Sequence, residues 1–351
     1  MSVVINGDFL CRNLTGIERF AYETCIRLDK IIEKDSIEIY VPSNAKFLPE
    51  FHNIKIVQSS KNCKIFPLWE HIEFSRYAAK NKLCPLDFAN VTPFFRPGIV
   101  FIHDIYAKLY PNDFSGKKDS LIKAYMCFMY RHAAKHAKKI ITVSDFSRQQ
   151  ISKVYGIDPK TIQIIYNGWE HIKNIESDSS ILQKYPELKP KKFYFTLGSL
   201  QKRKNLKWIA DYASEHADEL FAISGKAISG MVSDDIKALQ TLKNVILVGY
   251  VSDEQVKALM ESCKAFIFPS YYEGFGIPPL EAISCGAPVI ISRAASLPEL
   301  YGNCAHYIEP DNTKVNLNDI LLEKTEPSET ILKKYTYQKA AEDLKEILKN
   351  Y

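Results

Sequence analysis

Two glutamates bracket a glycine-rich turn late in the chain, and this is the segment whose residue types are best suited to chemistry. Glu273 and Glu281 have seven residues between them, and Gly274 and Gly276 lie in the turn. Glycine lets the backbone approach a ligand closely where a Cβ would hinder it. Two carboxylates on either side of such a turn can accept hydrogen bonds from hydroxyl groups at opposite ends of one ligand.

The elements on both sides of the turn favour an anion site. Residues 264–268 are a short apolar run that predicts a buried parallel strand. The proline pair 278–279 suits the first turn of a helix, which we expect to end near Cys285, before Gly286. The N–H groups at a helix start bind anions, and the helix dipole strengthens that binding. A diphosphate would fit there.

This segment resembles the signature of the retaining nucleotide-sugar glycosyltransferases of family 4, which have the GT-B fold. The resemblance implies an α/β protein with two Rossmann-like domains whose parallel sheets face each other across a cleft. It also implies that the turn holds the transferred sugar, that amides at the helix start lie near phosphate, and that the second glutamate holds the ribose. The residues are Glu273, Gly274, Phe275 and Gly276 for the sugar, Ile277 and Leu280 for phosphate, and Glu281 for ribose. The same spacing also fits an ordinary strand-turn-helix with two solvated glutamates.

A basic loop follows the apolar run 193–197, where we expect a strand-to-helix turn. It resembles the family's diphosphate-binding loop, which implies that Arg203 and Lys204 stabilise the departing nucleoside diphosphate. Many family members have an arginine where this chain has Ser199, so binding of the diphosphate should depend more on Arg203. Whether Arg203 or Lys204 makes the closest contact stays open. Lys226, after the next strand, is either a further phosphate or sugar contact or a surface lysine.

A third turn follows the apolar run 245–248. In the resembling family this turn lies against the nucleobase, which implies Tyr250 and Val251 as base contacts. A packed aromatic residue at a strand end is the alternative for Tyr250. Ser252, with Gln255 three residues later, predicts the start of a capped helix.

The amino-terminal half carries weaker signals of the same kind. The loop before a helix expected from about residue 17 resembles the family's glycine loop facing the donor phosphates, which implies Gly16 as a donor-binding residue. The apolar run 99–102 ends in His103 and Asp104, and side chains at the carboxyl end of a parallel strand face the ligand crevice. The resemblance implies that His103 contacts the sugar, with Asp104 as an acceptor-side group. A lone histidine is otherwise more often structural.

At 351 residues, with strand and helix patterns alternating throughout, the chain suits two α/β domains. We expect an acceptor-binding Rossmann-like domain over residues 1–172, a polar linker over 173–190, and a nucleotide-sugar-binding Rossmann-like domain over 191–336. The last stretch, 337–351, has the apolar period of an amphipathic helix. The resemblance implies that this helix crosses back to the first domain.

Several signals are missing from the sequence. It has no basic leader, no run of about 18 apolar residues and no Cys-x-x-Cys, so we expect no signal peptide, spanning helix, disulfide framework or zinc site. The eight cysteines then indicate reduced thiols of a cytoplasmic protein. No Asp-x-Asp is present, so we expect neither a metal nor another cofactor, with the cations taking the place of the metal.

Positive charge is concentrated in residues 51–150, which hold 16 Lys or Arg against 7 Asp or Glu, whereas the whole chain is +5. Within this region, residues 121–139 mix apolar and basic side chains. The pattern fits either docking on an anionic membrane surface, at the inner face of the cell membrane, or a core helix with a basic polar face. The family's use of lipid-linked acceptors favours the membrane. No recognised nucleic-acid module accompanies the charge, so we do not expect nucleic acid as a partner.

Together these features predict transfer of a sugar from a nucleoside-diphosphate sugar, with retention at the anomeric carbon, to a lipid-linked saccharide acceptor. The motifs most resemble bacterial rhamnosyl- and mannosyltransferases that build capsule, O-antigen or related cell-surface polysaccharides. As donor, dTDP-rhamnose is slightly ahead of GDP-mannose, with UDP-sugars as a further alternative. In this prediction Arg203 and Lys204 stabilise the leaving diphosphate. The alternatives are a nucleotide-sugar epimerase or phosphorylase of the same fold, and a non-catalytic subunit of a glycosyltransferase complex.

Overall fold

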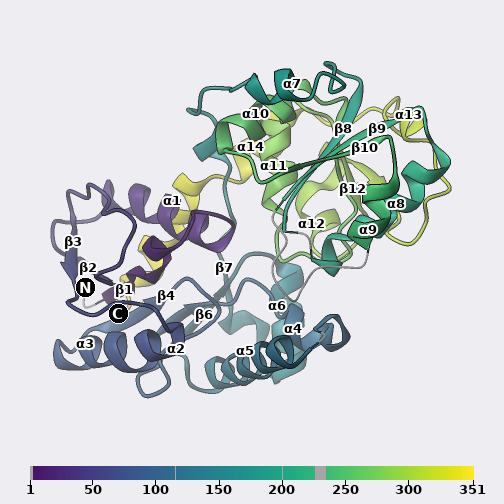
Figure 1. The fold of residues 1–351 in the computed structure, drawn as a ribbon. Coiled ribbons are helices and arrows are strands. Elements are labelled where there is room, and N and C mark those ends of the chain that lie inside the picture. The colour runs from purple at the N-terminus through teal and green to yellow at the C-terminus, as the bar shows by residue number, and fades with distance from the viewer. Residues whose placement is uncertain (1–2, 115, 200, 226–234) are drawn as a thin grey trace. The chain divides into compact units, whose positions relative to one another are not determined.

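The computed structural model describes residues 3–114, 116–199, 201–225 and 235–351, and the chain divides into two compact units (Figure 1). Each unit has its own parallel sheet, with helices packed against it. Unit 1 comprises Met1–Leu109, Ile122–Gly168 and Thr336–Tyr351, and unit 2 comprises Tyr110–Leu121 and Trp169–Tyr335.

Within the described residues, the sheet of unit 1 has the strand order β3-β2-β1-β4-β5-β6-β7, and each pairing is parallel. Its inner strands are apolar and buried, as strands covered on both faces must be. The chain reverses its direction of winding between β1 and β4, which makes this the topological switch point of the sheet. The strands are β1 (Val3–Asn6), β2 (Ile37–Val41), β3 (Ile54–Gln58), β4 (Cys84–Asp87), β5 (Ile99–Phe101), β6 (Lys139–Thr142) and β7 (Gln163–Ile164).

The last helix of the chain, α15, packs against the first, α1, as the yellow and purple ribbons in Figure 1 show. Tyr337, Leu344 and Leu348 of α15 are buried in one cluster with Phe20 and Leu28 of α1. The helices of unit 1, of which α5 starts in the segment grouped with unit 2, are α1 (Ile17–Asp29), α2 (Phe66–Leu68), α3 (Ser75–Lys80), α4 (Tyr106–Leu109), α5 (Lys117–His136), α6 (Asp145–Tyr155) and α15 (Tyr337–Leu348). A π-helical turn, Trp69–Phe74, joins α2 to α3.

The sheet of unit 2 repeats this topology, with the order β10-β9-β8-β11-β12-β13 among the residues that the structure describes. Its switch point lies between β8 and β11, which pair in parallel with Phe195 opposite Phe266. The strands are β8 (Phe193–Leu197), β9 (Leu220–Ser224), β10 (Val245–Gly249), β11 (Ala265–Phe268), β12 (Val289–Ser292) and β13 (His306–Ile308).

Helix α10 of unit 2 begins as the sequence predicted. Ser252 Oγ accepts a hydrogen bond from Gln255 N at 3.3 Å, and Gln255 Oε1 accepts one from Ser252 N at 3.4 Å, so both halves of the capping box are present. The helices of unit 2 are α7 (Ser180–Lys184), α8 (Leu206–Glu215), α9 (Asp235–Thr241), α10 (Asp253–Ser262), α11 (Ile277–Ser284), α12 (Leu297–Tyr301), α13 (Leu317–Ile320) and α14 (Ser328–Lys334).

The division of the chain differs in detail from the expected boundaries. Residues 173–190, expected as a linker, belong to unit 2 and contain helix α7. Lys257 Nζ of helix α10 donates to the Ile175 carbonyl at 2.7 Å, so the polar segment is fastened to its unit. Tyr110–Leu121 is grouped with unit 2 although it lies between two segments of unit 1 in sequence. Among the described helices, none combines the length and apolar character needed to cross a bilayer.

Candidate active site

The switch point of unit 2 brings together two loops that are far apart in sequence. One follows β8 and carries Arg203 and Lys204 in the 3-10 turn Lys202–Lys204. The other follows β11 and carries Glu273. Because β8 and β11 are neighbours in a parallel sheet, their carboxyl ends lie at the same edge, which is where open α/β sheets bind ligands. The structure thus places the predicted cations beside the first predicted glutamate.

Both carboxylate oxygens of Glu273 are paired. Arg203 Nη1 donates to Oε2 and Lys204 Nζ to Oε1, each at 2.7 Å, and the Glu273 side chain is only 7% exposed. Burial alone would raise the pKa of Glu273, but the charges of Arg203 and Lys204 outweigh it and lower the pKa from its ordinary value. Glu273 is therefore ionised at neutral pH, and the three side chains form one charge-assisted cluster.

Neighbouring groups fix the two cations in place. Arg203 Nε donates to Gln201 Oε1 at 3.0 Å, and its Nη1 also lies 3.3 Å from the Tyr272 carbonyl oxygen. Lys204 Nζ lies 4.7 Å from the ring centroid of Phe268, and a Cβ at Gly198 would come within 3.2 Å of the lysine Cε. Glycine at 198 therefore leaves room for the stem of Lys204.

Asn205 fastens the basic loop to the rest of unit 2. It adopts a left-handed conformation with φ of 55° and precedes helix α8. Its Nδ2 donates to the Pro269 carbonyl at 3.0 Å and to the Pro310 carbonyl at 2.7 Å. The loop after β8 and the loop after β11 are thus tied through backbone carbonyls as well as through the ion pairs.

The glycine turn needs its glycine at position 276. Gly276 has a φ of +87°, and a Cβ built there would lie 2.7 Å from Leu297 Cδ2, so a side chain is excluded on both counts. The hydroxyl of Tyr301 donates to the Gly276 carbonyl, and Ser296 Oγ donates to the Glu273 carbonyl at 2.9 Å. Side chains from the segment after β12 thus stabilise the backbone of the turn by donating hydrogen bonds to its carbonyl oxygens.

Helix α11 starts immediately after this turn, with Pro278 and Pro279 in its first turn as predicted. Leu280 is fully buried, so its side chain packs in the core and only its backbone is left for the predicted phosphate contact. Phe275 is also buried, with its ring 5.5 Å from that of Tyr335 in an edge-on arrangement. The side chain of Phe275 therefore stabilises the turn by packing in the interior of unit 2.

Glu281, the predicted ribose residue, has a partner that the sequence did not reveal. Its Oε1 lies 2.9 Å from His171 Nε2, and the two side chains are 12% and 7% exposed. His171 stands alone in the sequence, without a motif or a periodic pattern to mark it. Only the folding of unit 2 brings it to helix α11.

The remaining residues predicted for the donor differ in their surroundings. Tyr250 is 63% exposed, so the alternative of a packed aromatic residue is wrong, whereas Val251 is buried. Ser199 lines a small hollow with Gly198 and Lys204 at the strand ends. Lys226 lies outside the described residues.

In unit 1, Gly16 is the residue that immediately precedes helix α1. Its φ of 52° and ψ of −112° are a combination that residues with a Cβ rarely adopt. The loop before it is braced by Arg12, which forms ion pairs with Asp8 and, at 2.9 Å, with Glu18. The predicted glycine thus has a conformational reason to be glycine, and its role toward a ligand stays a prediction.

His103 is buried and lies just after strand β5. Its Nε2 lies 2.8 Å from the Phe88 carbonyl oxygen, which requires a proton on this nitrogen, and its ring packs edge-on against Phe20. Burial lowers the pKa of His103, so the ring is neutral and Nδ1 is an acceptor. Asp104 Oδ1 accepts a hydrogen bond from Tyr106 N at 2.9 Å, at the start of helix α4. Both residues thus have structural partners, and their predicted roles toward sugar and acceptor stay predictions.

Two family models cover most of the chain. The model described as Glycosyltransferase Family 4 matches residues 14–171, and the model described as Glycosyl transferases group 1 matches residues 177–339. The chain belongs to the family 4 glycosyltransferases. This confirms the family that the glycine turn and the basic loop indicated.

The glycosyltransferase is 26% identical to the O-antigen chain mannosyltransferase RfbU of Salmonella typhimurium, over 89% of this chain and 88% of the relative. It is 31% identical to the O-antigen chain mannosyltransferase B of Escherichia coli, over 50% and 49%. In structure it matches HepE of Anabaena in complex with UDP-glucose, with a TM-score of 0.72, 18% identity and all of both chains covered. WaaG, a glycosyltransferase of lipopolysaccharide biosynthesis, matches with a TM-score of 0.64 and 16% identity over 97% and 94%. The GT-B fold is confirmed.

The glycosyltransferase also holds a buried acidic cluster that the sequence did not reveal, at the switch point of unit 1. Asn6 Nδ2 donates to Glu70 Oε2 and, at 3.0 Å, to Asp87 Oδ1, while Trp69 Nε1 donates to Asn6 Oδ1 at 2.8 Å. Both carboxylates are 1% exposed. Burial, and then the charge of Asp87, raise the pKa of Glu70 well above its ordinary value. Burial likewise raises the pKa of Asp87 well above its ordinary value, so this pair retains a proton at pH values where exposed carboxyls are ionised.

Substituting Glu70→Gln is expected to stabilise the glycosyltransferase most at alkaline pH. Because the folded-state pKa of Glu70 lies above its unfolded value of about 4.3, the folded state binds more protons, and stability falls as pH rises from that value toward the folded pKa. Glutamine can donate to Asp87 without ever ionising. Urea unfolding between about pH 5 and pH 9 measures the effect, as a shallower pH slope in the variant.

The matched control is Glu33→Gln, which changes an exposed glutamate of the same unit. It should keep the pH slope of the wild type. An unchanged slope in Glu70→Gln would show that Glu70 does not hold a proton in the folded state.

Proposed function

We propose that this glycosyltransferase moves a mannosyl group from GDP-mannose, with retention and without a metal, to a lipid-linked saccharide in the synthesis of a bacterial cell-surface polysaccharide. The observation that carries the proposal is the cluster of Arg203, Lys204 and the buried Glu273 at the switch point of unit 2. Similarity to O-antigen mannosyltransferases supports mannose over the rhamnose that the sequence motifs placed first.

In the proposed reaction, the oxygen of the acceptor hydroxyl forms a bond to the anomeric carbon while the bond from that carbon to the diphosphate breaks. The acceptor proton passes to an oxygen of the departing diphosphate, so no protein base is required. Negative charge grows on the diphosphate, and Arg203 and Lys204, which both bind Glu273 in the structure, would stabilise it. Glu273 would orient the sugar through its hydroxyl groups, and a sugar contact by His103 stays a prediction from the sequence.

The state of Glu273 supports the front-face route over a double displacement. A double displacement needs a carboxylate nucleophile beside the anomeric carbon. Both oxygens of Glu273 accept hydrogen bonds from cations, which reduces their availability for attack. The same two cations offer the positive charge that a divalent metal would otherwise bring to the diphosphate.

Transfer assays with GDP-mannose, dTDP-rhamnose and UDP-galactose test the proposal, with a polyprenyl-diphosphate-linked saccharide as acceptor. We expect mannose transfer from GDP-mannose, an α-linked product by NMR, and an unchanged rate in EDTA. A β-linked product would refute retention, and loss of activity in EDTA would refute metal independence. Failure to bind any nucleoside diphosphate would favour the non-catalytic subunit.

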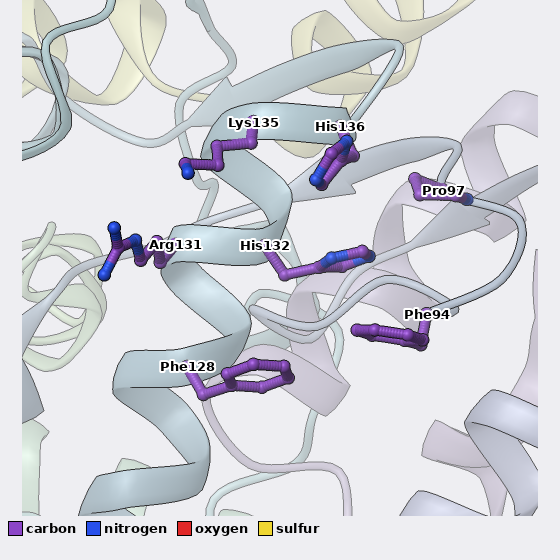
Figure 2. A pocket seen from close by; sticks show the side chains of 7 residues that line it. All are labelled: Phe94, Pro97, Phe128, Arg131, His132, Lys135 and His136. Carbon is purple, nitrogen blue, oxygen red and sulfur yellow. The ribbon is translucent and has the colours of Figure 1, made fainter.

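The α5 surface of unit 1, defined as Phe94, Phe95, Phe128, Arg131 and Lys135, is where we propose that the protein docks on an anionic membrane. Phe95 and Phe128 are 80% and 54% exposed. Figure 2 shows Phe128, Arg131 and Lys135 on helix α5. Together with Phe94 and two histidines, they line a pocket of about 590 Å³. Other side chains of the same helix, such as Met129, are buried, so α5 is a core helix that also presents aromatic and basic groups to solvent.

The double variant Arg131→Ala/Lys135→Ala is expected to weaken binding to vesicles that contain anionic phospholipid. Each cation near such a surface contributes about 1 kcal/mol, so the loss should be roughly 30-fold. Co-sedimentation with phosphatidylglycerol-containing vesicles measures it, with pure phosphatidylcholine vesicles as the neutral comparison. Lys153→Ala/Lys160→Ala removes the same charge from an exposed region elsewhere in unit 1 and should bind as the wild type does. Equal weakening by both variants would assign the binding to net charge alone.

A further inference from the structure

His171 contacts the predicted ribose residue from a segment that carries no family motif. The histidine lies in the 3-10 turn Glu170–Ile172, near the start of the long segment of unit 2. Its Nε2 is 2.9 Å from Glu281 Oε1. With both side chains largely buried, this contact is shielded from solvent, and a hydrogen bond is electrostatically stronger there than at a surface.

The backbone that carries His171 is fastened on both sides. Before it, Trp169 Nε1 donates to the Leu332 carbonyl at 3.0 Å. After it, Ile172 is buried and Lys257 Nζ binds the Ile175 carbonyl at 2.7 Å. The imidazole is therefore presented from a fixed position, whereas Glu281 is a long side chain that loses up to about 2 kcal/mol of conformational entropy when it is ordered.

We propose that His171 is a positioning residue for nucleotide binding: its Nε2–H donates to Glu281 Oε1 and holds the carboxylate so that the other oxygen accepts from the ribose hydroxyls. This inference rests on the proposed function, because it takes Glu281 as the residue that binds ribose. A carboxylate has about four lone-pair sites, so the bond to His171 leaves acceptor capacity for hydroxyl groups. Ordering the carboxylate in advance removes part of the entropic cost from the binding step.

Calorimetric titration with GDP and with 2′,3′-dideoxy-GDP tests this role, because the second ligand lacks the hydroxyls that Glu281 would bind. His171→Phe keeps a ring but removes the donor, and should weaken GDP binding roughly tenfold while dideoxy-GDP binding stays unchanged. His171→Gln keeps an N–H donor and should recover most of the affinity. With GDP-mannose as substrate, KM should rise in His171→Phe more than kcat falls.

His216→Phe is the matched control, because His216 is a histidine of the same unit that hydrogen-bonds the Tyr212 carbonyl instead of Glu281. It should bind both nucleotides as the wild type does. Equal weakening of both nucleotides by His171→Phe would show a general effect on the fold and overturn the proposal.

Two wild-type results separate this proposal from the function on which it rests. If the wild type binds GDP and dideoxy-GDP equally while it transfers mannose, the positioning role is refuted and the proposed function stands. If it binds no nucleoside diphosphate, both are refuted.

Discussion

Arg203→Met is expected to lower kcat of mannose transfer by about 10²- to 10³-fold, the usual cost of removing one fixed donor from a developing anion. Methionine keeps an unbranched stem of similar flexibility but removes the charge and the hydrogen bond to Glu273. KM for GDP-mannose should change much less, because the charge on the diphosphate grows as the reaction proceeds. Steady-state kinetics of the variant and the wild type measure both constants.

Lys204→Met is measured beside it, and the ratio of the two kcat values decides which cation is closer to the diphosphate. Lys207→Met is the control, because Lys207 is an exposed lysine of helix α8 that pairs with Asp211. It should leave kcat unchanged. A rise in KM with unchanged kcat in Arg203→Met would show that Arg203 binds the donor uniformly and does not act on the transition state.

Glu281→Ala is expected to weaken GDP binding by roughly 10- to 100-fold, because hydrogen bonds to a charged group contribute about 1.5–3 kcal/mol each. The substitution also leaves His171 without its carboxylate partner at 2.9 Å. Isothermal titration with GDP, without metal, gives the change directly. The variant should lose its preference for GDP over dideoxy-GDP at the same time.

Glu261→Ala serves as the control for this variant, since it removes an exposed glutamate from helix α10 of the same unit. Its affinity for GDP should equal that of the wild type. If Glu281→Ala also binds GDP normally, the ribose lies elsewhere, and the prediction that Glu281 binds the ribose is wrong.

The features that could be predicted from the sequence are strands, helix caps and turns that depend on residues close together in the chain. The apolar run 193–197 became β8 with the same bounds, and Ser252 with Gln255 became a capping box. Gly274 and Gly276 were predicted together as turn glycines, and Gly276, with a φ of +87°, has the backbone conformation that favours glycine. The cluster of Arg203, Lys204 and Glu273 could be predicted in part. The loops that carry these residues follow two strands whose carboxyl ends meet at one edge of the sheet.

The contacts that escaped prediction join residues whose proximity depends on the order of the strands. Asn6, Glu70 and Asp87 come from three segments of unit 1, and no spacing in the sequence relates them. His171 and Glu281 meet for the same reason in unit 2. The exposure of individual side chains on α5 could not be predicted either. The pattern of residues 121–139 does not distinguish the buried Met129 from the exposed Phe128, because the packing of α5 determines which side faces solvent.

The packing of helix α15 on helix α1 sets the order in which the chain can finish folding during synthesis. Trp169–Tyr335 leaves the ribosome before residues 337–348, so the long segment of unit 2 is available to fold first. Unit 1 starts earlier but stays incomplete, because the α1 side chains Phe20 and Leu28 lack part of their cover until Tyr337, Leu344 and Leu348 arrive. The half of the protein that is made first is thus completed last, and a nascent chain that stops short of its final helix presents an uncovered apolar surface to chaperones and proteases.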